Sequence, residues 1–186
     1  MGIKGIISKM TLDNIDIRYI IRGLIDGSLS SLGVVIGASG GDVGIIIGAG
    51  IGGGVANGIS NILGALTAER AMLEGERASQ EKVLLQSSGS LKRSSSYQEA
   101  LDRTAVSGIQ DGVATAFGSI VPVIPFFIFD KLTAIIVSIL ITLSLLFILG
   151  IYIGKMSKEQ LHIAGLKMVI GGVLVALIAF GIERLV

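Results

Sequence analysis

An uncharged apolar stretch of membrane-spanning length constrains this chain more than any other feature. Residues 132–153 contain no Asp, Glu, Lys, Arg or His. A helix of about 20 apolar residues crosses the hydrocarbon core of a bilayer, where no water can satisfy free backbone N–H and C=O groups. The stretch therefore predicts a transmembrane helix.

Four further stretches fit the same interpretation, although one contains Arg22 and Asp26 and another contains Lys167. Only 16% of the residues are charged and the mean hydropathy is +0.81, whereas a soluble domain is roughly 25% charged. The expected fold class is an all-α integral membrane protein with five transmembrane helices. The additional stretches are residues 20–38, 43–67, 112–129 and 163–182.

The distribution of Lys and Arg predicts the orientation in the membrane. Thirteen of the 15 basic residues fall on one side: eleven precede the first span, lie between the second and third, or lie between the fourth and fifth, and Arg22 and Lys167 lie near the starts of the first and fifth spans. Only Lys131 and Arg184 fall on the other side. The positive-inside rule then predicts a cytoplasmic N-terminus and an external C-terminus, in the cell membrane if the organism is a prokaryote. Topology explains these charges, so the expected partner is lipid and not nucleic acid.

The charge pattern divides the chain into four regions. The first is an expected interfacial amphipathic helix, in which one face is formed by Ile3, Ile6, Ile7 and Met10. The second holds the first two spans. The third is a charged cytoplasmic helical hairpin, where Ser96 followed by Glu99 forms a capping-box pattern that predicts a helix start, and the fourth holds the last three spans. These regions are residues 1–17, 18–67, 68–105 and 106–186.

Two features inside the predicted spans each allow two interpretations. Gly44, Gly48 and Gly52 recur every four residues, a spacing that lets helices approach closely in lipid, either within one subunit or across a dimer seam. Pro122 and Pro125 either break the third span beside a water-lined cavity or simply end it.

Asp26 is the ionisable residue that most needs an explanation. A carboxylate at the centre of a transmembrane helix costs about 2.5 to 3.5 kcal/mol, and less near an interface. Gly23 and Gly27 flank Asp26 and leave room for an ion to approach it, which predicts a metal ligand at the membrane entrance. The alternative is an ion pair with Arg22, four residues earlier on the same helix.

Other polar residues fall within or beside the spans. Asp111 stands at the start of the third span, where it is either a metal ligand or a carboxylate stabilised by the helix dipole. Asn57 and Asn61, together with Ser60 between them, are candidates to line a pathway. Asn57 and Asn61 could equally hydrogen-bond across a helix interface, which is worth about 1 kcal/mol in a membrane.

The hairpin carries a second candidate metal site. Glu69, Met72 and Glu76 share one helical face, and Glu74 and Glu81 share another. Converging carboxylates bind divalent cations, and a thioether favours softer transition metals. The alternative is a solvated helix of mixed charge. The chain contains no cysteine, so thiolate metal sites are excluded.

Residues 22–27, Arg-Gly-Leu-Ile-Asp-Gly, resemble the G-x-x-D-G run that opens the first span of the vacuolar iron transporter family. The family's third-span G-x-x-x-P-x-x-P pattern and the basic residue and glycine of its last span have counterparts in Gly118, Pro122, Pro125, Lys167 and Gly171.

The resemblance implies a homodimeric transporter, not an enzyme and without a resident cofactor, that moves ferrous iron or manganese out of the cytoplasm with protons as the counter-ion. It also implies that the hairpin carboxylates gather the metal and that Asp26 receives it. The second span departs from the family pattern S-M-x-x-G-E, because Asn61 and Ala65 replace the methionine and the glutamate. The alternative function is a non-transporting scaffold of the same fold, whose hairpin binds a partner.

Overall fold

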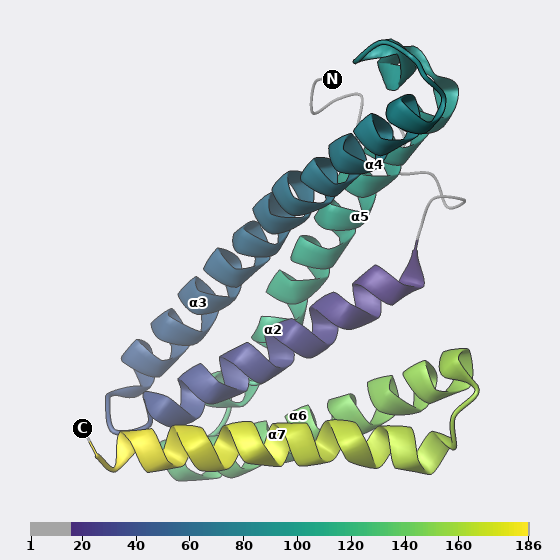
Figure 1. The fold of residues 1–186 in the computed structure, drawn as a ribbon. Helices are drawn as coiled ribbons and strands as arrows, with labels where there is room; N and C mark the ends of the chain where they lie inside the picture. The colour runs from purple at the N-terminus through teal and green to yellow at the C-terminus, as the bar shows by residue number, and fades with distance from the viewer. Residues whose placement is uncertain (1–15, 186) are drawn as a thin grey trace.

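The computed structural model describes residues 16–185, and every regular element in that range is helical (Figure 1). The expected interfacial helix at residues 1–17 lies almost entirely outside the described residues. A π-helical turn joins α3 to α4, and short 3-10 turns precede α5 and α6. The helices are α2 (Ile17–Gly37), α3 (Val43–Gly64), α4 (Arg70–Val83), α5 (Ser95–Ile120), α6 (Lys131–Ser157) and α7 (Leu161–Glu183).

Four helical stretches among the described residues are long and apolar enough to cross a membrane, namely α2, α3 with its continuation α4, α6 and α7. The fifth long helix, α5, is more polar. It packs extensively against both α2 and α3, and Figure 1 shows it running alongside them. Because neighbouring helices cover much of α5, its polar groups find protein partners instead of lipid. Over residues 16–185 the protein is therefore an all-helical membrane protein with four apolar membrane-length helices and a polar helix packed against two of them.

The second predicted span continues directly into the hairpin. Through the π-helical turn Ala65–Glu69, α3 and α4 form one long helix, and α5 returns beside it. The N-cap of α5 is Ser94, whose hydroxyl accepts a hydrogen bond from the Tyr97 amide at 3.3 Å. The predicted capping box at Ser96 and Glu99 is wrong by two residues, because Ser94 caps the helix and starts it about half a turn earlier. The side of the membrane on which the hairpin lies stays a prediction.

The third predicted span, residues 112–129, is α-helical only as far as Ile120. A turn and the 3-10 segment Ile124–Phe127 follow and lead into α6. The carbonyl of Pro122 accepts a hydrogen bond from the buried Ser138 hydroxyl of α6 at 2.7 Å. The prolines therefore end the helix, and α6 satisfies a carbonyl that the interrupted helix leaves free.

The helix ends gather on one side of the molecule and spread apart on the opposite side (Figure 1). At one end, the Lys131 ammonium donates to the carbonyl of Gly41 at 2.8 Å, which ties the α2–α3 turn to the start of α6. The end of α7 lies there too, whereas the α4–α5 and α6–α7 turns lie at the other. Among residues 16–185, the fold thus separates Lys131 and Arg184 from the other basic residues. Which end faces the cytoplasm stays a prediction.

Candidate functional site

A polar cluster forms where α2, α3 and α5 meet. One carboxylate oxygen of Asp26, Oδ2, accepts hydrogen bonds from the side-chain amides of Asn57 at 3.0 Å and Asn61 at 2.8 Å. Asn57 also donates to the hydroxyl of Ser30 at 3.1 Å, and Asn61 donates to the hydroxyl of Thr115 at 2.9 Å. We call these five residues the Asp26 cluster.

Helical spacing and glycines together build this cluster. Its two members on α2 are four residues apart, as are its two members on α3, so each pair projects from one helix face. The helices approach closely because glycines line their contact. A Cβ atom added to Gly27 would overlap the backbone oxygen of Thr115, and one added to Gly58 would lie 2.6 Å from the oxygen of Gly112. Short polar side chains can therefore reach across the interface.

Arg22 pairs with Asp111 and not with Asp26. The guanidinium donates to both carboxylate oxygens, at 3.1 and 2.7 Å. The Asp111 side chain is 2% exposed, whereas the Arg22 side chain is 58% exposed. The alternative explanation of Asp26 as the ion-pair partner of Arg22 is therefore not what the structure shows, and both oxygens of Asp111 are engaged by Arg22. A role for Asp111 as a metal ligand stays a prediction.

Sequence reasoning missed Ser30 and Thr115. A signal was available, because each lies four residues after a residue that was singled out, Asp26 and Asp111 respectively. The third predicted pathway residue, Ser60, lies on the exposed side of α3, outside the Asp26 cluster. Of the three pathway candidates, the structure therefore brings two together with Asp26.

The carboxylates of the hairpin do not converge on one point. Met72 and Glu76 are exposed and Glu69 is partly buried on the π-helical turn. Glu74 accepts hydrogen bonds from the Arg77 guanidinium at 2.7 Å and from the Tyr97 hydroxyl at 2.5 Å. Within residues 16–185, no group of three or more acidic or histidine side chains is arranged to hold a metal ion. The metal-gathering role of these residues stays a prediction.

Glu81 has a structural role at the tip of the hairpin. Its side chain is 4% exposed, and it accepts hydrogen bonds from the backbone amides of Gly89 and Leu91, both at 2.9 Å. The Arg77 guanidinium donates to it at 2.6 Å. Burial alone raises the pKa of Glu81, but these three hydrogen bonds outweigh burial and lower its pKa to about 2. The ionised carboxylate therefore fastens the turn between α4 and α5.

The turn of the hairpin should loosen in acid. Because the folded pKa of Glu81, about 2, lies below its ordinary value of 4.5, its stabilisation is complete above the ordinary value and is lost as the pH falls towards the folded value. Hydrogen exchange of the Gly89 and Leu91 amides, corrected for the intrinsic effect of pH, should therefore rise only below the ordinary value. Glu81→Gln should raise exchange at neutral pH and abolish this dependence. Equal opening at neutral pH in both proteins would contradict the assignment.

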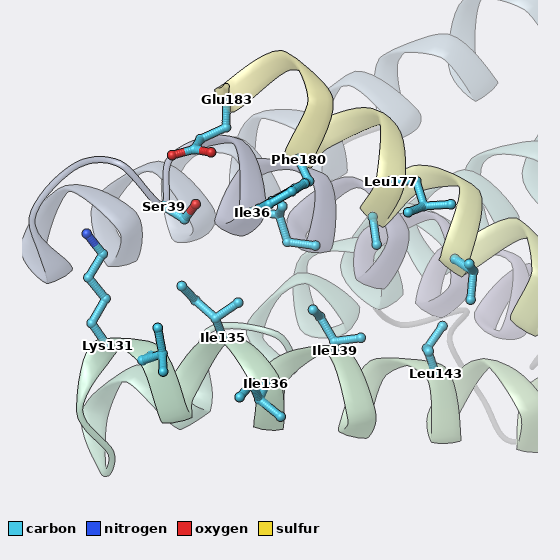
Figure 2. Close-up of a pocket in the computed structure, with 13 residues that line it drawn as sticks. Ile36, Ser39, Lys131, Ile135, Ile136, Ile139, Leu143, Leu177, Phe180 and Glu183 are labelled. Carbon is cyan, nitrogen blue, oxygen red and sulfur yellow. The ribbon is translucent and has the colours of Figure 1, made fainter. Parts of the chain in front are cut away.

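A large apolar cavity lies away from the Asp26 cluster. It has a volume of about 780 Å³ and is lined by α6, α7 and the end of α2, with Lys131 and Glu183 as its two charged lining residues (Figure 2). Its contact with α2 is at Ile36, ten residues beyond Asp26, or about 15 Å along the helix. The pocket offers mainly aliphatic side chains, so the cluster of polar groups that forms the candidate site lies instead at the α2–α3–α5 interface.

Comparison with known proteins agrees with this architecture. The chain matches the sequence profile of the VIT family over residues 88–184, which include α5, α6 and α7. It is also 55% identical, over 168 residues, to an uncharacterized protein of Methanocaldococcus jannaschii, in an alignment that covers 90% of this chain and 88% of that protein. The predicted resemblance to this family is therefore confirmed, and the chain belongs to the VIT family, a family of membrane transporters.

Proposed function

We propose that this protein is a transporter that moves Fe²⁺ or Mn²⁺ out of the cytoplasm in exchange for protons. Membership of the VIT family supports the general activity. The observation that carries the proposal is Asp26, a partly buried carboxylate on an apolar membrane-length helix that is held by two amides and not by a cationic side chain. An ionised carboxylate in such a position is costly, and binding of a cation or a proton offsets that cost. In this proposal Asp26 therefore marks an ion pathway.

In this proposal the ion approaches from the hairpin end of the bundle. Glu69, Met72 and Glu76 supply the exposed or partly exposed ligands that gather it, whereas Glu74 and Glu81 hold the hairpin together. The ion then reaches Asp26 past the Arg22–Asp111 pair, which lies one helical turn nearer that end. Protonation of a carboxylate on the pathway weakens its hold on the metal and couples release to the proton gradient.

Metal flux in proteoliposomes tests this function directly. Purified protein should accelerate Mn²⁺ movement across the vesicle membrane relative to protein-free vesicles, and an imposed pH gradient should change the rate. Flux that ignores the pH gradient would remove proton coupling from the proposal. Absence of flux for both Mn²⁺ and Fe²⁺ would favour the scaffold alternative, in which the hairpin binds a partner.

The transporter is proposed to act as a homodimer, and an open glycine stripe on α3 is the proposed seam. Gly44, Gly48 and Gly52 have no neighbouring atom near their added Cβ positions, whereas Gly54 and Gly58 pack against α5. The stripe is therefore not used for packing within the described part of the subunit. Small residues at this spacing let two transmembrane helices approach closely.

Gly48→Leu is expected to shift the protein from dimer to monomer in detergent, because the leucine side chain would separate the two α3 backbones. Light scattering on the purified protein would measure the change. Gly181→Leu is the matched control, since Gly181 on α7 is also open within the subunit. A dimer that survives Gly48→Leu but not Gly181→Leu would move the seam to α7.

A further inference from the structure

We infer that the Asp26 cluster is a site for hard, oxygen-seeking divalent cations and that it gives no added preference to soft ones. This inference rests on the proposed function, in that the cluster is taken as the ion site, and it names the class of ion that the site accepts. It is drawn from the donor atoms that surround Asp26 and from the composition of the three helices that meet there.

The three helices limit the chemistry of any site between them. Their sequences, α2, α3 and α5, contain no methionine, histidine or cysteine. The sulfur and imidazole groups of the described residues lie on α4, α6 and α7 instead. From these three helices, an ion held between them therefore meets only oxygen ligands and nitrogen groups that are hydrogen-bond donors. These oxygen ligands are a carboxylate, amide carbonyls, hydroxyls and backbone carbonyls.

The amides of Asn57 and Asn61 can change from hydrogen-bond donors to Asp26 into carbonyl ligands of an ion. In the structure both Nδ2 atoms point at the same oxygen of Asp26, at 3.0 and 2.8 Å. A half-turn of a terminal amide exchanges its Nδ2 and Oδ1 atoms. When a cation sits beside the carboxylate, the rotated amides would present two carbonyl oxygens to it. Their hydrogen bonds to Asp26 would then be replaced by ion contacts.

Ser30 and Thr115, the remaining members of the Asp26 cluster, add two hydroxyl oxygens to its possible ion ligands. The hydroxyls of Ser30 and Thr115 lie within 3.1 and 2.9 Å of the same two amides, so they border the same space from α2 and α5. Carboxylate, carbonyl and hydroxyl oxygens suit Mg²⁺, Ca²⁺ and Mn²⁺, whereas thioether, thiolate and imidazole ligands add affinity for softer ions. The cluster therefore binds Mn²⁺ and admits Ca²⁺ as a competitor. It offers no ligand that singles out a soft ion.

A comparison of Ca²⁺ and Cd²⁺ isolates this property, because the two ions are similar in size and differ in softness. Mn²⁺ bound to the purified protein in detergent is measured by electron paramagnetic resonance, and each ion is titrated as a competitor. The part of the bound-Mn²⁺ signal that is lost in the Asp26→Asn variant is assigned to the Asp26 cluster. In the unmodified protein, Cd²⁺ should displace Mn²⁺ at concentrations no more than about tenfold below those of Ca²⁺.

Replacing one amide by a thioether should change this ratio. Asn61→Met is expected to lower the competing concentration of Cd²⁺ several-fold relative to that of Ca²⁺, and Asn61→Leu, which supplies no ligand, should weaken binding of both ions alike. Asn57→Met is the second variant if Asn61→Met does not fold. A ratio that already favours Cd²⁺ by orders of magnitude, or that neither methionine variant changes, would overturn the inference. Absence of any Asp26-dependent Mn²⁺ binding would also overturn it.

The failure of this inference differs from the failure of the proposed function. Mn²⁺ flux in proteoliposomes together with strong Cd²⁺ preference at the Asp26-dependent site leaves transport standing and removes the oxygen-only selectivity. Binding with comparable Ca²⁺ and Cd²⁺ competition but without flux leaves the selectivity standing and removes transport.

Discussion

Asp26→Asn is expected to abolish metal transport while leaving the protein folded. Asparagine keeps the shape of the side chain, and its Oδ1 can still accept hydrogen bonds from Asn57 and Asn61. The substitution removes the negative charge whose attraction offsets the free-energy cost of dehydrating a divalent ion. Flux in proteoliposomes should fall to the level of protein-free vesicles, while the melting temperature in detergent changes little.

Asp42→Asn is the matched control for this experiment. Asp42 precedes α3 at the opposite end of the bundle from the hairpin, is exposed and makes no capping hydrogen bond through its side chain. The same chemical change at this position should leave transport intact. Persistent transport in Asp26→Asn, at a rate comparable with Asp42→Asn, would remove Asp26 from the pathway.

Gly27→Ala should produce the largest loss of stability among single-methyl substitutions in α2. A Cβ atom at this position would overlap the backbone oxygen of Thr115, and a backbone atom cannot move aside as a flexible side chain can. The helices would have to separate, at a cost of about 3 kcal/mol or more, the upper end of the range for overpacking. Because Asn61 bridges Asp26 on α2 and Thr115 on α5, this separation of α2 from α5 would also break one of its two hydrogen bonds. Unfolding by denaturant in detergent would measure the change.

Gly37→Ala is the matched control on the same helix. An added Cβ at Gly37 meets nothing within 4 Å, so no steric cost arises. The higher helix propensity of alanine should leave the stability unchanged or raise it by about 0.5 to 1 kcal/mol. If both variants lost stability equally, the close contact between α2 and α5 would not be the cause.

Much of the helical framework could be predicted from local sequence. The predicted spans at residues 43–67 and 132–153 correspond to α3, Val43–Gly64, and α6, Lys131–Ser157. Transfer of a segment into lipid depends on its own side chains, so a bare apolar stretch identifies its helix without knowledge of its neighbours. Prediction was weaker at residues 112–129, because two prolines inside an apolar stretch can end a helix without making the segment less apolar.

The residues of the site were easier to predict from the sequence than the pairs that they form. Asp26, Asn57 and Asn61 stood out because polar groups inside a span need a reason to be there. The convergence of Asn57 and Asn61 on one carboxylate oxygen of Asp26 could not be predicted from the sequence, because α2 and α3 could have met through other faces. The pairing of Arg22 with Asp111 joins residues 89 positions apart and excludes the nearer partner that helical spacing favoured.

The amino-acid sequence by itself determined that this protein is helical and membrane-embedded, since the free energy of transferring a helix into lipid adds up along one segment. Only the tertiary structure decided which polar side chain pairs with which. A hydrogen bond or ion pair forms within about 3 Å, so its partner depends on the helix faces that meet and on how closely they approach. In this protein, glycines such as Gly27 allow that approach, and the resulting contact leaves Asp26 with two amides as partners instead of Arg22.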